Sequence, residues 1–444
     1  MKLRLAAFLC FLASAQIASG ATEVSREQIG TWLEANSAAS ATFAPGDILT
    51  SADLDRLRPF VPPGQAEEFD FPEFRMEIGA TGDYSPHPVY QQATLQHAGQ
   101  TRLAEDGAML DYVAGQPFTL EAIDTASPER AGYMGAWNSN RRWQNFGQNV
   151  ILAYTLFMQE RPGAASDFSG FPPNMISGGG HLERHVEGGW RRTYFTHLPQ
   201  LADTNHRFEF SGAEKVAYKE LNEYFEPFDF RDQKLLQERW IDPYEDDTLN
   251  AYLPNERKVR RLSAKEKSDT WIGSEITFDD FYGFDGQVLH YTWRYLGRHK
   301  VMTVMNTKHA YAHHIGPNSR VADDRWELRE AVVIEGVPTL EGHPYGSRML
   351  FLDAQNFMYI NGLYFDQAGK LMRGAMPVYS WSEETLDHPE VNRGVRISMY
   401  KGYSFVNFQT GNSTVTNILE TSYPNAEPKK IRRLYRVDTL NQGR

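Results

Sequence analysis

Apolar and polar residues alternate along much of the chain after about residue 190. The clearest case is the segment 289–295. One face of this segment carries the apolar residues Leu289, Tyr291, Trp293 and Tyr295. A second segment, 325–334, repeats the pattern, and its apolar face begins with Trp326 and Leu328. A period of two residues predicts β-strands, each with one face buried and the other in water.

The same pattern predicts further strands at residues 348–353, 357–366, 371–379, 395–400, 403–408 and 433–438. We expect the segments 395–400 and 403–408 to form a hairpin across Lys401-Gly402, and the last segment to close the set. Roughly a dozen closely spaced strands predict an antiparallel sheet. Flat sheets of this width are rare, so the sheet is expected to be curled or closed.

The first part of the chain has a helical and loop-rich pattern instead. Ser25 and Ser51 are each placed to cap a helix, and residues 89–100 form a third short helical pattern. Residues 138–158 have apolar side chains at helical spacing, which predicts a longer helix. These side chains are Trp143, Phe146, Val150 and Tyr154. Glycine and proline then interrupt the regular pattern over residues 162–189.

The N-terminus has the three parts of a secretory signal peptide. Lys2 and Arg4 precede a largely apolar run at 5–18, and small residues follow at 18–21. The one cysteine, Cys10, lies inside this run, so the mature chain would have no thiol and neither disulfides nor thiolate metal sites. The predicted parts are a signal peptide (1–20), a helical and loop-rich extension (21–130), and a helix plus a β-barrel (131–440).

Composition narrows the class of protein. The chain has 57 acidic and 45 basic residues and a net charge of −12, which disfavours nucleic acid as a partner. Aromatic residues make up 13% of the chain, a richness that suits β-structure. The composition therefore indicates a folded, β-rich protein that does not bind nucleic acid.

Several colinear stretches of the chain resemble one protein family. They include residues 61–63, 111–118, 136–138, 257–261, 278–286, 291–298, 325–328, 343–353 and 364–373. These stretches are similar to the DUF1329 proteins, and they cover nearly the whole mature chain. The resemblance implies an α+β, mainly antiparallel fold of the LolA/LolB type, in which an unclosed β-barrel holds helices at its open face and accepts acyl chains. It also implies a periplasmic protein, often found near RND-type exporters and a DUF1302-type outer-membrane barrel.

Two histidine clusters are candidate metal ligands. His181, Glu183 and His185 would share a face on a strand, which suits a two-histidine, one-carboxylate site. His309, His313 and His314 form the second cluster. The alternative is that these side chains simply face water on a polar loop or strand, and short motifs match by accident often enough to favour it. We therefore expect no metal and no other cofactor.

Acidic residues offer one further candidate site. Asp279 and Asp280, beside Asp285, could act as an acid pair in hydrolysis, because close carboxylates split their pKa values. We expect instead that they shape a turn and accept backbone N–H groups. The chain has neither a G-x-S-x-G elbow nor a G-x-x-x-x-G-K-[ST] phosphate loop. No enzyme activity is therefore expected.

The apolar strand faces are the remaining candidates. We expect an apolar cavity lined by Leu289, Tyr291, Trp293, Tyr295, Trp326 and Leu328. Such a cavity would make the protein a carrier or accessory factor for a lipid or other hydrophobic molecule moving between an exporter and the outer membrane. Two alternatives stay open. One is a metal-assisted hydrolase that uses the first histidine cluster, and the other is a ligand-free scaffold that docks on an outer-membrane barrel.

Overall fold

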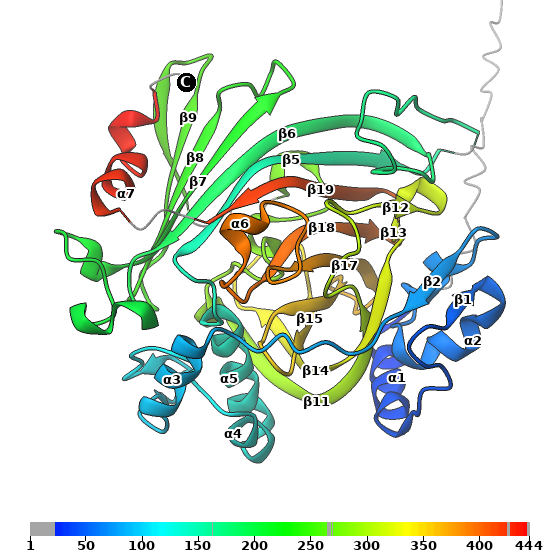
Figure 1. Ribbon diagram of the computed structural model, residues 1–444, viewed down its shortest axis with the longest axis horizontal. Coiled ribbons are helices and arrows are strands. Elements are labelled where there is room, and N and C mark those ends of the chain that lie inside the picture. Colours follow the sequence, from blue (N-terminus) through cyan, green and yellow to red (C-terminus); the bar gives the residue numbers. More distant parts are fainter. Residues whose placement is uncertain (1–22, 162, 264–267, 269, 424–426, 442–444) are drawn as a thin grey trace, which may run out of the picture.

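One 15-stranded sheet dominates the computed structural model, which describes residues 23–161, 163–263, 268, 270–423 and 427–441 (Figure 1). The strands lie in the order β1 (Ile48–Thr50), β2 (Arg75–Ile78), β14 (Arg325–Pro338), β15 (Ser347–Asp353), β16 (Tyr359–Phe365), β17 (Leu371–Trp381), β18 (Ser398–Asn407), β19 (Ser413–Ser422), β5 (Gly147–Gln159), β6 (His181–Tyr194), β7 (Val216–Glu226), β8 (Lys234–Trp240), β9 (Thr248–Leu253) and β10 (Lys258–Leu262). A further strand, β11 (Tyr291–Thr303), pairs with β14. Two separate two-stranded ribbons join β3 (Arg102–Leu103) to β4 (Met109–Leu110) and β12 (His314–Ile315) to β13 (Val321–Ala322).

The large sheet is almost wholly antiparallel and strongly curved. The one parallel pair of named strands joins β14 to β2 through Arg325 and Trp326 in the described part of the chain. Figure 1 shows the strands bending around a central space, with β7, β8 and β9 spreading away from it. No ladder among the described residues joins β10 back to β1 or β11, so the barrel stays open. The expected α+β, mainly antiparallel and unclosed fold is confirmed.

Helices flank the lower part of this sheet in Figure 1. They are α1 (Arg26–Ala38), α2 (Leu54–Leu57), α3 (Pro88–Gln96), α4 (Leu120–Thr125) and α5 (Pro128–Asn140). Two helices later in the chain lie elsewhere in Figure 1: α6 (Pro389–Asn392) near the centre and α7 (Pro428–Leu434) at the upper left. Ser25 begins α1 as expected, in a capping box with Gln28. Helix α5 packs directly on β11, because Gly132 has no side chain to separate the two backbones. A Cβ at this position would lie 2.4 Å from the backbone nitrogen of Arg294.

The prediction of a helix at residues 138–158 is wrong. Helix α5 ends at Asn140, and strand β5 begins at Gly147. Strand β5 pairs with β6 on one edge and β19 on the other. Its last part is buried over four consecutive residues, 155–158. A short apolar run of this kind is compatible with a buried strand as well as with a helix. Here the segment forms a strand because it pairs with strands that are distant in sequence.

Other expected elements differ as well. The hairpin across Lys401-Gly402 is instead one continuous strand, β18. Lys401 fits inside that strand because its buried ammonium pairs with Asp387. The strand expected at 433–438 is wrong, because α7 covers its start and a 3-10 turn, Val437–Thr439, covers its end. Strand β6 begins at His181, inside the stretch that glycine and proline were expected to keep irregular.

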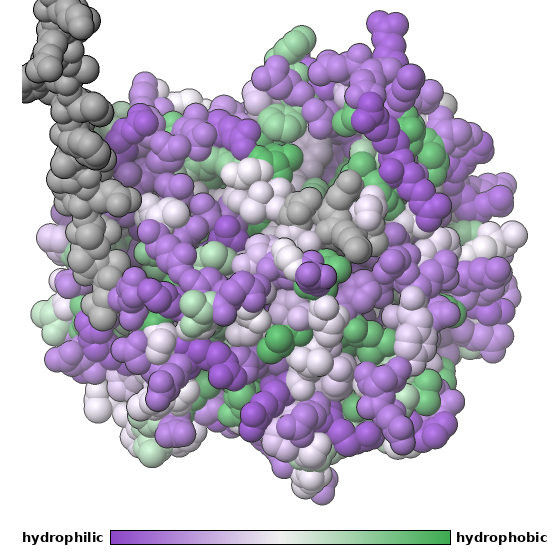
Figure 2. All heavy atoms as spheres, turned by 180° about the vertical axis from the view of Figure 1, so that it is seen from behind, coloured by the Kyte–Doolittle hydropathy of each residue, from purple (hydrophilic) through white to green (hydrophobic). Residues whose placement is uncertain are grey.

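Three further observations concern the N-terminus, the helices and the surface. The predicted signal peptide, residues 1–20, lies outside the described residues. Among the helices that the structure describes, none is long and apolar enough to cross a membrane. On the face shown in Figure 2, apolar residues occur as small patches within a mainly hydrophilic surface.

Candidate functional site

An irregular segment, residues 270–290, fills the concave side of the sheet. Its regular structure consists of the 3-10 turns Trp271–Gly273, Phe278–Asp280 and Val288–His290. Its aromatic side chains pack against several strands. The ring contacts are Trp271 with Tyr224 of β7 (6.1 Å) and with Phe157 of β5 (6.4 Å), and Phe281 with Trp190 of β6 (6.5 Å). This inner segment therefore occupies part of the space in which an apolar cavity was expected. Whether that space admits a hydrophobic ligand stays a prediction.

A buried ion pair holds the inner segment to β15. Arg348 donates to the Asp280 carboxylate over 3.1 Å, and Tyr345 donates to the same carboxylate over 2.7 Å. Asp280 also accepts the backbone N–H of Thr277 at 2.7 Å, so it shapes the turn as expected. Burial raises the pKa of the Asp280 carboxyl, and the charge of Arg348 opposes part of this rise.

A second polar contact holds the inner segment to the other side of the sheet. Asp285 accepts hydrogen bonds from Arg192 of β6 and Tyr218 of β7, both at 2.8 Å. Gln237 of β8 also donates to Asp285, over 3.3 Å. Asp280 and Asp285 are thus each held by a different arginine, which gives both carboxylates an anchoring role rather than that of a free acid pair.

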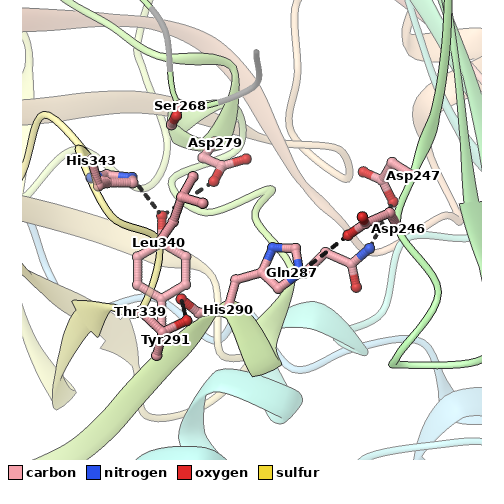
Figure 3. Close-up of a pocket in the computed structure, with 10 residues that line it drawn as sticks. All are labelled: Asp246, Asp247, Ser268, Asp279, Gln287, His290, Tyr291, Thr339, Leu340 and His343. Atoms are coloured by element: carbon pink, nitrogen blue, oxygen red, sulfur yellow. Dashed lines mark hydrogen bonds and ion pairs between the residues drawn. The ribbon is translucent and has the colours of Figure 1, made fainter. Parts of the chain in front are cut away.

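A cavity of about 280 Å³ lies where the inner segment meets β11 (Figure 3). It is lined by Asp246, Asp247, Ser268, Asp279, Gln287, His290, Tyr291, Thr339, Leu340 and His343. The loop between β8 and β9 supplies the first two of these residues, and the loop between β14 and β15 supplies the last three. The cavity is near the lower end of the size range for small-molecule sites, and most of its lining residues are polar.

The Tyr291 hydroxyl is the centre of the hydrogen bonds at this cavity. It donates to Asp279 Oδ2 (3.2 Å) and accepts from Arg348 Nη2 (2.9 Å). His343 Nδ1 accepts the backbone N–H of Tyr345, so its other nitrogen carries the proton and donates to Tyr291 over 3.1 Å. These partners fix the direction of every hydrogen bond around the phenol.

Burial keeps two titratable side chains beside this cavity, those of His343 and Tyr291, neutral near neutral pH. Burial, aided by the charge of Arg348, lowers the pKa of His343 to about 4. Burial raises the pKa of the Tyr291 hydroxyl well above its usual value. General acid–base catalysis works best when a pKa lies near the working pH. Near neutral pH both side chains stay uncharged, and their hydrogen-bonding groups are already paired within this network.

Charged groups at the mouth of the cavity are also paired. His290 Nε2 lies 3.3 Å from Asp246 Oδ1. Arg239 donates to Asp247 over 2.8 Å, and Gln287 donates to the Glu245 carbonyl over 2.8 Å. The contacts of His290 and Gln287 hold the β8–β9 loop against the inner segment, and Asp246 and Asp247 of this loop place two carboxylates in the cavity lining.

The structure separates the six residues predicted to wall a cavity. Tyr291 and Trp293 are both buried, with their ring centroids 5.5 Å apart. Tyr291 also borders the cavity described above. Leu289 and Tyr295 are half-buried beside them. Trp326 and Leu328 belong to another hydrophobic core. There the ring centroid of Trp326 lies 5.5 Å from that of Phe69 in the N-terminal part of the chain. Whether any of them contacts a ligand stays a prediction.

The histidine clusters do not assemble a metal site in the described part of the chain, which has no group of three suitable ligands. His181, Glu183 and His185 lie on β6, where His185 is 3.6 Å from Glu187. The rings of His309 and His313 stack at 3.7 Å, and His314 is fully buried near them in sequence.

Sequence reasoning missed His343 and Arg348. A detectable signal exists for Arg348, which stands within Ser347–Asp353, a strand that is buried at every position. A charge inside an apolar run requires a buried partner, and the acidic pair at residues 279–280 offered one. His343 left no comparable signal, since it lies in a loop and only the fold brings it to Tyr291.

Solved structures match the chain at low sequence identity and with low TM-scores. A putative outer membrane lipoprotein-sorting protein domain from Vibrio parahaemolyticus is 15% identical, with a TM-score of 0.44, and the match covers 70% of this chain and 98% of that one. A DUF1329 family protein from Desulfovibrio piger is 14% identical, with a TM-score of 0.45 and coverage of 71% and 100%. A LolA superfamily protein from Nitrosomonas europaea is 12% identical, with a TM-score of 0.36 and coverage of 66% and 92%.

No curated protein matches the chain. The family model described as "Protein of unknown function (DUF1329)" matches residues 48–440, which is most of the sequence. The chain therefore belongs to the DUF1329 family.

Proposed function

We propose that this protein is a periplasmic carrier or accessory protein that binds a lipid or other hydrophobic ligand inside the curved sheet. It has no catalytic activity of its own, and it serves an RND-type export system together with a DUF1302-type outer-membrane barrel. One observation carries the proposal: an irregular segment, and not a strand or a long helix, covers the aromatic concave face. The signal-peptide pattern at residues 1–20 supports the location.

The inner segment occupies the place that an apolar ligand would take. Trp271 and Phe281 cover Tyr224 and Trp190, and a residual gap of about 20 Å³ remains beside them. Irregular segments open more easily than paired strands. A ligand with about ten buried methylenes would contribute about 8 kcal/mol, enough to offset the opening of a few ring contacts.

The cavity beside Tyr291, with its mostly polar lining residues, is where the polar end of such a ligand would lie. The Tyr291 hydroxyl is already hydrogen-bonded to both Asp279 and His343 there. Because the groups are held before binding, a ligand's hydroxyl or amide would meet an ordered site. The proposed ligand is thus amphipathic, with an apolar chain under the inner segment and a polar group in the cavity.

Mass spectrometry tests the proposal directly. The protein is purified from its native host, its lipid extract is analysed, and the delipidated protein is titrated with a fluorescent fatty acid. The expected result is a co-purified hydrophobic molecule and saturable uptake of the fatty acid. An empty protein that also takes up no fatty acid would overturn the carrier function.

A second function is favoured by a specific observation. The close packing of Trp271 and Phe281 against the strands is what a ligand-free scaffold docking on an outer-membrane barrel would have. Cross-linking in cells distinguishes the two. A barrel cross-link combined with an empty, non-binding protein supports the scaffold, whereas a bound ligand supports the carrier.

A further inference from the structure

The C-terminal part of the chain is strongly basic in an otherwise acidic protein. Five of the eight residues at 429–436 are lysine or arginine, although the whole chain has a net charge of −12. Lys430 pairs with Glu427 at 3.1 Å, and Arg436 pairs with Asp438. Within the described residues the other three form no ion pair. These are Lys429, Arg432 and Arg433, and all three are exposed.

Buried side chains fix the direction of this basic surface. Ile431 and Tyr435 are both 3% exposed and pack into a core with Phe195. The Tyr435 hydroxyl lies 2.8 Å from Thr193 Oγ1 and donates to the Arg191 carbonyl over 3.0 Å. Helix α7 is therefore held against β6 by its apolar face, and its cations stay outside.

A groove of about 560 Å³ runs between α7 and the start of β7. It is lined by Phe195, Phe210, Ser211, Lys219, Lys429, Ile431, Arg432, Arg433, Tyr435 and Arg436. Phe195 and Phe210 meet edge to face at 5.6 Å and form its aromatic floor. Arg432 lies 5.8 Å from the centre of the Phe210 ring. The groove thus has an apolar floor below a cationic rim.

We propose that this groove binds an anionic phospholipid of a bilayer, with its phosphate on Arg432 and Arg433 and the upper part of one acyl chain on Phe210. Arginine matches phosphate oxygens with paired N–H donors, and exposed cations are attracted to anionic lipid surfaces. The aromatic floor suits the apolar part of the same molecule. This contact would bring the protein to a membrane, and it does not depend on whether the interior accepts a ligand.

Vesicle co-sedimentation of the mature chain tests the proposal. One vesicle set has three parts phosphatidylethanolamine to one part phosphatidylglycerol, and the other is pure phosphatidylcholine. The protein is expected to bind the anionic vesicles alone, and added salt is expected to weaken this binding. Equal binding to both sets, binding that salt leaves unchanged, or no binding to either set would overturn the proposal.

Matched variants locate the contact. Arg432→Gln with Arg433→Gln is expected to lower the partition coefficient by about 30-fold, from the loss of two cations at the surface. The control, Arg75→Gln with Lys308→Gln, removes the same charge beside β2, which lies away from α7 in Figure 1. It is expected to bind nearly as the wild type does. A basic-groove variant that binds like this control would overturn the proposal.

Discussion

Arg348 and Asp280 form an ion pair at 3.1 Å, and both side chains are completely buried between β15 and the inner segment. Each partner has further hydrogen bonds. Arg348 also donates to Tyr291, and Asp280 also accepts from Tyr345 and Thr277. Removing two charges from water is costly, so these additional bonds are what makes the pair tolerable in the core. The pair therefore couples the inner segment to the sheet and to the cavity at once.

Removing one partner of this pair should strongly destabilise the protein. Arg348→Met leaves the Asp280 carboxylate buried without its cation, and we expect the free energy of unfolding to fall by about 3–5 kcal/mol. Chemical denaturation measures this. The control is Arg298→Met. Arg298 pairs with Asp124 and Glu330, and the exposed fractions of the three side chains are 33%, 32% and 50%. That variant should lose about 1 kcal/mol or less. Equal losses would contradict the prediction.

His343 should make the protein less stable in acid. Its pKa is about 4 in the folded chain and about 6.5 in an unfolded one. Between these values the unfolded state binds the proton and the folded state does not, so stability is full above pH 6.5 and is lost as the pH falls toward 4. His343→Gln should flatten this part of the profile of unfolding free energy against pH.

His388 provides a control of opposite sign. A hydrogen bond to Glu390, 3.3 Å away, raises the pKa of His388, so its stabilisation is present at low pH and lost as the pH rises through the folded value. His388→Gln should therefore steepen the loss in acid. If both variants shift the profile in the same direction, the assignment of the acid sensitivity to His343 is wrong.

Gly283 should not tolerate a side chain. Its φ is +85°, and a Cβ would lie 2.1 Å from Tyr359 Cγ, so Gly283→Ala adds a clash to a left-handed backbone. Gly369 has φ +75° with no atom within 4 Å of such a Cβ. Gly369→Ala should cost about 1–2 kcal/mol from conformation alone, and Gly283→Ala about 1–3 kcal/mol more. Thermal unfolding compares them, and equal costs would show that the inner segment packs loosely on β16.

Trp271→Ala should make room under the inner segment. The truncation should cost about 3–5 kcal/mol of stability and, if the carrier proposal holds, tighten binding of a fluorescent fatty acid by at least about tenfold. Trp143→Ala is the control, since Trp143 is also buried but belongs to a separate core with Tyr90. Tighter binding by both variants, or by neither, would argue against a ligand path beside Trp271.

Local sequence patterns predicted the elements that local chemistry controls. Ser25 capped α1 because its side chain and that of Gln28 satisfy the first backbone N–H groups of the helix. Tyr291 and Trp293 became buried and Thr292 exposed because a strand turns alternate residues to opposite faces. The prediction failed for residues 138–158, where the same apolar residues suit a helix or a strand and pairing with β6 and β19 decided.

The candidate site shows the same division. Tyr291 was named from its strand pattern, and the acidic turn at residues 279–280 was named from its composition. Their partners His343 and Arg348 lie more than fifty residues further along the chain, so no local pattern relates them. Only the closing of the curved sheet brings these groups within hydrogen-bonding distance.

By itself, the sequence determined the family, the antiparallel class of the fold and the faces of the best-patterned strands, because these follow from near neighbours in the chain. The tertiary structure alone decided that the segment 270–290 packs against the strands of the curved sheet. Whether a curved sheet is hollow depends on where a segment such as 270–290 runs and on the buried charges that hold it there. Those contacts join residues far apart in sequence. They stabilise the protein only after the sheet has curved and brought these residues together.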